Sequence, residues 1–135
     1  MDLTAAAWAE IENRHHFFVE WFTGRADGAA MEASARAFAP DMAMIGPSGG
    51  LAGADQVIEM LRAARGRRGP DFTIRVELVA ARLLAPDLVQ IIYDEHQAHA
   101  GETSARRSTA LFSPDEAAPE GVVWRSLHET WIKAD

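Results

Sequence analysis

The sequence contains no cysteine, which excludes disulfide bonds and catalysis by a thiolate. A cytoplasmic protein is therefore expected. No stretch approaches the roughly 18 consecutive apolar residues of a membrane-spanning helix. The first residues also lack the basic segment and apolar run of a secretory signal. We therefore expect neither a membrane partner nor an export signal.

Positive charge is scarce, with 13 Lys and Arg against 20 Asp and Glu and a net charge of -7. A protein with this net negative charge is repelled at long range by the negatively charged backbone of nucleic acids, so we expect no nucleic-acid partner. The one basic cluster falls where a predicted helix ends, and it comprises Arg62, Arg65, Arg67 and Arg68. Cations at that end complement the helix dipole, so we interpret the cluster as a solvated helix end. An anion-binding patch is the alternative.

The glycine-rich stretch GPSGGLAGADQ, residues 46–56, raises the question of a phosphate-binding loop. A P-loop requires a Lys followed by Ser or Thr, and a dinucleotide fingerprint requires three glycines at fixed spacing; this stretch has neither. Asp55 puts negative charge in the first turn of the next helix, which disfavours a bound phosphate. We predict a strand, a turn and a helix here, and no cofactor.

The remaining pattern predicts one domain spanning residues 1–135, a length that can bury a sizeable core. The first helix carries an apolar stripe that includes one histidine: Trp8, Ile11, His15, Phe18 and Phe22. Helices are predicted at 4–23, 29–39 and 54–65, and strands at 42–45, 72–84, 88–99, 103–112 and 122–132. Helices followed by a run of antiparallel strands indicate an α+β fold.

Two of the predicted strands, 88–99 and 122–132, do not alternate cleanly between apolar and polar residues. A sheet with one wet face would show such alternation, so both faces are expected to be covered. Three modest helices can cover one face. A second copy of the chain is the simplest cover for the other, which predicts a homodimer through the sheet.

Three segments carry a resemblance to a known superfamily: FAPDMAMIGPSGGLAGADQVIEML, RRSTALF and VVWRSLHETW. Over roughly residues 7–132 the chain resembles the nuclear transport factor 2-like, or cystatin-like, superfamily. That superfamily includes ketosteroid isomerase, SnoaL-like polyketide cyclases and a kinase association domain. The resemblance implies a cone-shaped α+β fold, with three N-terminal helices packed on a curved antiparallel sheet. It also implies an apolar pocket between the two layers.

The period-2 geometry of strands nominates residues for that pocket. With the turn between the central strands centred on Gly101, Glu95 lies opposite Arg107 and Tyr93 opposite Thr109. The superfamily's arrangement implies that the odd-numbered residues of the last strand join them. The expected catalytic residues are Glu129, Glu95 and Tyr93, and the expected ligand-binding residues are Arg107, Trp131, Thr109, Leu111, Leu127, Trp21 and Met44. A one-residue slip would bring in Asp94, His96 and Arg106 instead.

A carboxyl group in an apolar pocket has a raised pKa, so Glu95 or Glu129 could move a proton next to a substrate carbonyl. Tyr93 would then donate a hydrogen bond to the developing oxyanion. This interpretation predicts a small apolar or carboxylated ligand and an isomerase, dehydratase or cyclase. In the alternative, Arg107 is flanked by Glu95 and Glu129 in a self-satisfied ion-pair network. The chain would then be a non-catalytic dimeric association or accessory domain with a vestigial pocket.

The histidines do not predict a metal site. His96 and His99 point to opposite faces of a strand, and His15 and His16 diverge by about 100° on a helix. His128 is interpreted as a core or interface residue. We therefore expect no bound metal.

Overall fold

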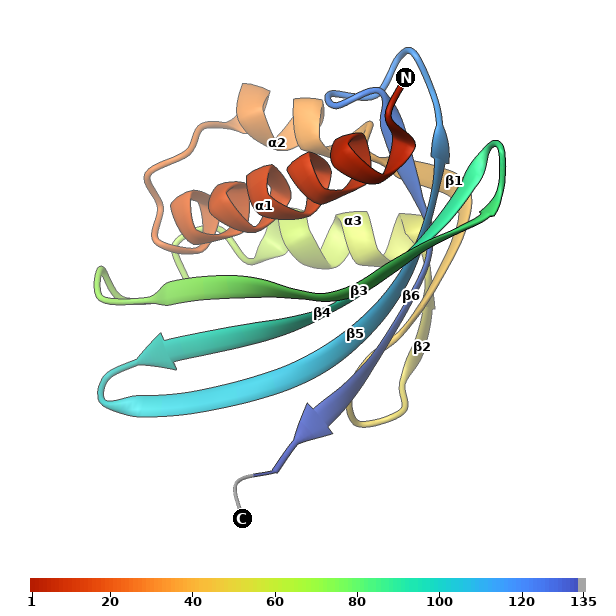
Figure 1. Ribbon diagram of the computed structural model, residues 1–135. Coiled ribbons are helices and arrows are strands. Elements are labelled where there is room, and N and C mark those ends of the chain that lie inside the picture. The colour runs from red at the N-terminus through yellow and green to blue at the C-terminus, as the bar shows by residue number, and fades with distance from the viewer. Residues whose placement is uncertain (134–135) are drawn as a thin grey trace.

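The computed structural model describes residues 1–133, in which three helices pack on one face of a strongly curved sheet (Figure 1). The helices are α1 (Leu3–Phe22), α2 (Gly28–Ala35) and α3 (Ala54–Ala63). The strands are β1 (Phe38–Ile45), β2 (Leu51–Gly53), β3 (Thr73–Ala85), β4 (Leu88–His99), β5 (Glu102–Pro114) and β6 (Val122–Ile132). The α+β class and the cone-shaped architecture are confirmed.

The sheet has six strands in the order β2-β1-β6-β5-β4-β3. Every neighbouring pair is antiparallel except β1 and β6, which run parallel. The sheet is therefore mostly antiparallel, as expected, with one parallel pair that the sequence did not indicate. β1 and β6 are far apart in the sequence but adjacent in the sheet, where they run in the same direction. β2, which the sequence did not reveal, is a three-residue hairpin partner of β1.

Helix ends follow local chemistry. The Asp2 carboxylate accepts a hydrogen bond from the backbone N–H of Ala5 at 3.0 Å and caps α1, which begins at Leu3, one residue before the expected start. α2 ends at Ala35, earlier than expected, because the backbone at residue 37 already accepts a bond from Trp124 N–H at 2.9 Å. The glycine-rich stretch 46–56 forms the β1–β2 turn, β2 and the start of α3, and Gly49 in the turn has a positive φ of 98°.

The β4–β5 turn fixes the register of the central strands. Ala100 and Gly101 both have positive φ, 53° and 80°, as the two central residues of a tight hairpin turn require. The turn is therefore centred between these residues and not on Gly101. As a result Glu95 pairs with Arg106, and Tyr93 pairs with Ser108. The expected register was wrong by one residue, because a non-glycine residue occupies the first left-handed position.

A second irregularity redirects the last strand. The pairing of β5 with β6 shifts between Leu111 and Phe112. Beyond this bulge the even-numbered Trp124 turns into the core, where its ring centroid lies 4.6 Å from that of Phe112. Arg125 is displaced outward and donates a hydrogen bond to Asp41 at 2.7 Å.

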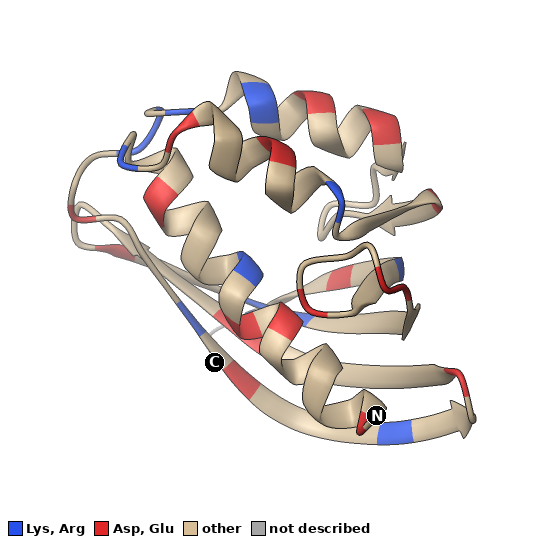
Figure 2. Cartoon of the chain, turned by 90° about the horizontal axis from the view of Figure 1, so that it is seen from above, with Lys and Arg blue, Asp and Glu red and all other residues tan. Residues whose placement is uncertain are grey.

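Acidic and basic residues are interspersed over the helices and strands (Figure 2). In the basic cluster after α3, Arg62 bonds Glu32 and Glu59, and Arg65 donates to backbone carbonyls of the α1–α2 connection. These contacts favour the interpretation as a helix end. Within residues 1–133 no helix combines the length and apolar character needed to cross a membrane.

Candidate functional site

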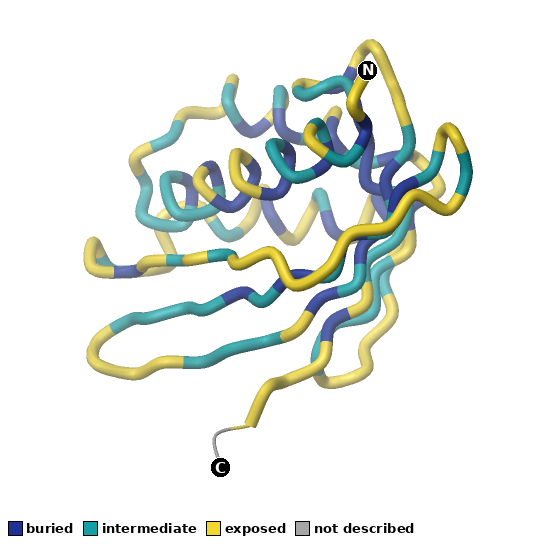
Figure 3. The backbone as a smooth tube through the Cα atoms, in the orientation of Figure 1, coloured by how far each residue is buried: buried dark blue, intermediate teal, exposed yellow. Residues whose placement is uncertain are grey.

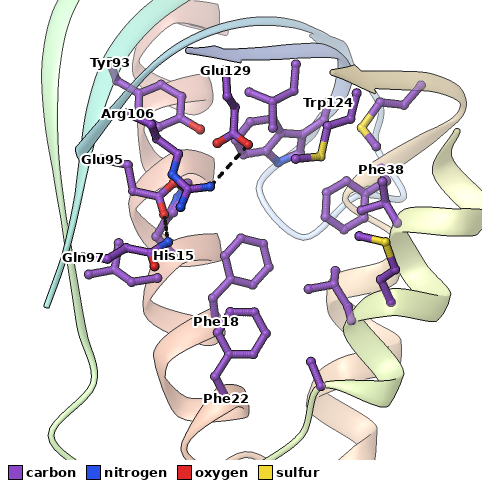
Figure 4. A pocket seen from close by; sticks show the side chains of 18 residues that line it. His15, Phe18, Phe22, Phe38, Tyr93, Glu95, Gln97, Arg106, Trp124 and Glu129 are labelled. Atoms are coloured by element: carbon purple, nitrogen blue, oxygen red, sulfur yellow. Dashed lines mark hydrogen bonds and ion pairs between the residues drawn. The ribbon is translucent and has the colours of Figure 1, made fainter. Parts of the chain in front are cut away.

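A cavity of about 270 Å³ lies between α1, α3 and the concave face of the sheet (Figure 4). Most of its wall is apolar, with Phe18, Phe22 and Phe38 facing the polar groups across the space. The polar groups gather at one end and come from α1 and three strands: His15, Tyr93, Glu95, Gln97, Arg106 and Glu129. An apolar cavity of about 150 Å³ suffices for benzene. This one therefore has room for a somewhat larger molecule.

Five of the residues nominated from sequence line this cavity. Tyr93, Glu95 and Glu129 lie at its polar end, and Leu127 and Met44 belong to its apolar wall. The three expected acid–base residues are thus brought together, although their catalytic role remains a proposal.

Three nominated residues lie on the opposite face of the sheet: Arg107, Thr109 and Leu111. The one-residue difference in register turned them outward. Arg107 bonds both carboxylate oxygens of Asp94, at 2.8 and 3.0 Å, and is not flanked by Glu95 and Glu129. Arg106 occupies the cavity in its place. Asp94 and His96 lie outside the cavity. The one-residue difference in register changes which residues of β5 face the cavity, whereas the residues of β4 that face it are those expected.

The two nominated tryptophans do not line the cavity. Trp21 is buried in the core, where its indole N–H donates to the carbonyl of Leu61 at 2.6 Å. Trp131 is 41% exposed and donates to the Ser48 hydroxyl at 3.2 Å. Its ring lies under the Arg106 guanidinium, 4.7 Å from carbon to centroid, so it acts on the cavity only through that residue.

His15, which sequence reasoning set aside, forms a buried ion pair with Glu95. Its Nδ1 lies 2.7 Å from the carbonyl of Ile11 and must donate to it, and its Nε2 lies 3.0 Å from Glu95 Oε1. The Gln97 amide donates to the other carboxylate oxygen at 2.6 Å. The position of His15 within the apolar stripe of α1 was the signal for an inward-facing polar residue.

Electrostatics fix the charges of this pair. Burial alone would favour the neutral acid, but the hydrogen bond and charge of His15 outweigh it and lower the pKa of Glu95 to about 2. Burial likewise disfavours a charged imidazole, yet the bond to Glu95 and its charge raise the pKa of His15. Between the pKa of Glu95 and the raised pKa of His15, the pair is therefore a carboxylate facing an imidazolium.

Glu129 has a different environment. Its side chain is 4% exposed, and Oε1 has no hydrogen-bond partner among residues 1–133. Burial raises its pKa, the charge of Arg106 at 3.6 Å opposes the rise, and the negative charge of Glu95 adds to it. Glu129 is thus the carboxyl group of this cavity whose charge can change most readily.

Two neighbouring hydroxyl groups are also unpartnered. The hydroxyls of Tyr93 and Ser108 are fully buried without a hydrogen-bond partner in the described part of the chain. Burial, followed by the charges of Glu95 and Glu129, raises the pKa of Tyr93 well above its ordinary value. The phenol therefore stays protonated and can donate a hydrogen bond to a ligand.

A second buried network beside the cavity shows what a satisfied ion pair looks like. Arg14 donates to both oxygens of Glu10 at 2.8 Å and to the Ser34 hydroxyl at 2.6 Å. The indole of Trp124 donates to Glu10 at 2.8 Å. The sequence analysis did not identify this network. Its groups bond one another, so we interpret it as stabilising the fold.

In the part of the chain that the structure describes, no group of three or more histidine and acidic side chains is arranged to hold a metal ion. His96 contacts Glu77 at 2.8 Å, and His99 accepts from the backbone N–H of Gly69. These two histidines lie on opposite faces of β4, as the spacing indicated.

The fold is that of the nuclear transport factor 2-like proteins. A sequence model of the sucrose-6-phosphate phosphohydrolase C-terminal family matches residues 10–133, and the chain belongs to this family. A search of curated protein sequences finds no match.

Solved structures with this fold include proteins of several kinds. An NTF-2-like protein of unknown function from Pseudomonas aeruginosa is 29% identical, with a TM-score of 0.80 over 95% of this chain and 99% of that one. A ketosteroid isomerase-like protein from Erwinia carotovora atroseptica is 13% identical, with a TM-score of 0.70 over 98% of each chain. A CaMKII hub from S. rosetta is 14% identical, with a TM-score of 0.71 over 98% of each chain.

Proposed function

We propose that the cavity binds a small, mainly apolar molecule and that Glu129 exchanges a proton with it. The observation that carries this proposal is a buried carboxyl group with a free oxygen facing an apolar space of about 270 Å³. A buried polar atom without a partner costs free energy unless something supplies the missing hydrogen bond. A ligand with one polar group would supply it.

The chemistry that fits is proton transfer next to a carbonyl group. Ionised Glu129 removes the α-proton, the electron pair moves onto the carbonyl oxygen, and Tyr93 donates a hydrogen bond to that oxygen. Returning the proton to the same or a neighbouring carbon completes the cycle. Glu95 takes no proton in this scheme, because His15 keeps it ionised. The resemblance to a ketosteroid isomerase-like protein supports this class of reaction.

A sugar phosphate, which the family description suggests, suits the cavity less well. The wall opposite the polar end is built from Phe, Met, Leu, Val and Ile side chains, which offer a hydroxylated ligand no hydrogen bonds.

The test uses α-tetralone, an aromatic ketone with exchangeable α-protons. We expect the protein to accelerate exchange of these protons in deuterium oxide, followed by NMR, and Glu129→Gln to lose the acceleration while staying folded. Glu77→Gln, on an exposed position of β3, is the control and should exchange like the wild type. If the wild type gives no acceleration, or Glu129→Gln keeps it, the catalytic proposal fails.

An association role is the second candidate, and a specific surface favours it. All three helices cover the same face of the sheet (Figure 1), and β3 lies at the sheet edge, exposed along most of its length (Figure 3). Its exposed side chains include Leu78, Val79, Leu83 and Leu84. A long apolar edge strand invites pairing with another chain.

We propose a homodimer formed through the sheet, consistent with the likeness to a CaMKII hub. Sedimentation as a monomer of 14.7 kDa at micromolar concentration would contradict this.

A further inference from the structure

We infer that the ligand of the cavity is an apolar monocarboxylate and that Arg106 binds its carboxylate. This inference rests on the proposed small-molecule function and names the chemical class of the ligand.

Arg106 is the feature that carries the inference. Only 17% of its side chain is exposed, yet it makes no hydrogen bond within residues 1–133. Its Nε is buried without a partner, and its Nη1 lies 3.6 Å from Glu129, beyond hydrogen-bonding distance. A guanidinium group has five N–H donors in a planar fork, a shape that matches a carboxylate.

Other arginines of the same chain show that this is unusual. Buried Arg14 makes three hydrogen bonds, two of them to Glu10. Arg107, the next residue along β5, makes two to Asp94 although it is exposed. Half-buried Arg125 bonds Asp41. Arg106 is thus the one largely buried arginine, among the described residues, whose Nε has no partner and whose side chain makes no protein hydrogen bond of ordinary length.

The charges at the polar end leave room for one anion. His15 and Glu95 neutralise each other, and Gln97 is uncharged. The remaining charged pair is Arg106 with Glu129. The guanidinium lies 3.6 Å from Glu129 and makes no hydrogen bond to it, so a ligand carboxylate would supply the hydrogen-bonded counter-ion that Arg106 lacks. A dianion such as a phosphate would keep one negative charge uncompensated beside the single cation Arg106, which favours a monoanion.

The position of Arg106 also suits a ligand that enters from outside. Its side chain borders both the cavity and a shallow surface depression lined by Arg68, His99 and Trp131. The Trp131 ring holds the guanidinium plane at this border. A ligand bound here would place its carboxylate on Arg106 and its apolar body against Phe18 and Phe22.

The test compares two probes of the same shape, para-toluate and its neutral amide, para-toluamide. Binding is followed at slightly acidic pH by the fluorescence of the tryptophans and by calorimetry. We expect the wild type to bind para-toluate about tenfold more tightly than para-toluamide, the magnitude of a charged hydrogen bond. Arg106→Gln should abolish this preference by weakening the binding of para-toluate far more than that of para-toluamide. Arg107→Gln, which alters the adjacent arginine on the other face, should keep the preference.

The outcomes separate the two proposals. If the wild type binds neither probe, the small-molecule function and this inference both fail. If it binds the amide as tightly as the carboxylate, the function stands and this inference is overturned. Persistence of the preference in Arg106→Gln would also overturn it. The wild-type comparison of probes decides the matter even if that variant does not fold.

Discussion

Glu129 and Arg106 face each other across the polar end of the cavity at 3.6 Å, a contact of opposite charges that is too long for a hydrogen bond. A buried pair of this kind normally closes to a bidentate contact, as Arg14 and Glu10 do in the same chain. Because Glu129 and Arg106 remain apart, each keeps polar atoms available to a molecule between the helices and the sheet. This relationship underlies the account of the site.

The raised pKa of Glu129 predicts a specific pH dependence of stability. Its folded-state pKa lies above the ordinary value of 4.5, so ionising it costs folding free energy. The wild type should lose stability as pH rises from about 4.5 through the folded pKa. Glu129→Gln should abolish that loss and be more stable than the wild type at neutral pH.

Urea unfolding at several pH values measures this effect. Glu77→Gln is the control of opposite sign, because the pKa of Glu77 is lowered by Arg75. If Glu129→Gln is no more stable than the wild type at neutral pH, the carboxyl group is not penalised by burial as described.

The His15–Glu95 pair predicts a loss of stability at both ends of the pH range. The stability from Glu95 is present above its ordinary pKa of 4.5 and is lost as pH falls toward about 2. The stability from His15 is present below 6.5 and is lost as pH rises through its raised folded pKa. His15→Gln should therefore cost most between these limits, about 3 kcal/mol, because it leaves a buried carboxylate unpaired.

Heteronuclear NMR of the imidazole nitrogens checks the same pair without a variant. We expect both nitrogens of His15 to carry protons at neutral pH. A neutral ring there would contradict the assignment of His15 as an imidazolium at this pH.

The Glu10–Arg14 network predicts a purely structural phenotype. Arg14→Met should destabilise the protein by about 3 to 5 kcal/mol, because Glu10 loses its cation in a buried site. Adding Glu10→Gln should restore part of the loss. Probe binding in the folded double variant should match the wild type, since neither residue lines the cavity. A loss of binding would mean that this network also shapes the cavity.

The backbone conformation of the β4–β5 turn can be tested by two substitutions, Ala100→Gly and Gly101→Ala. Ala100 adopts a left-handed conformation that costs a non-glycine residue about 1 to 2 kcal/mol. Ala100→Gly should therefore stabilise the protein by about 1 kcal/mol, after the entropy lost by glycine is included. Gly101→Ala should destabilise it by a similar amount. Thermal unfolding measures both, and a loss of stability in Ala100→Gly would contradict this turn geometry.

Most elements could be predicted from sequence because their signals are local. The period of the apolar residues located three helices and the long strands to within a few residues. Strand β2 and the parallel β1–β6 pair were not predictable, since the first is very short and the second depends on long-range topology.

The site was predicted in part, and its errors have one main cause. Period-2 geometry placed Tyr93 and Glu95 correctly because β4 needed no assumption about the turn. On β5 the same geometry depended on one turn residue, so it selected Arg107 where the structure places Arg106. The contact of His15 with Glu95 joins residues 80 positions apart, and only the packing of α1 on the sheet reveals it.

A crystal structure of the protein purified from cells without added ligand tests the central claim most directly. The account predicts ordered density between the helices and the sheet, with one end against Tyr93 and Glu129 and a polar group on Arg106. A dry interior filled by side chains, with Arg106 closed onto Glu129 in a bidentate contact, would contradict it.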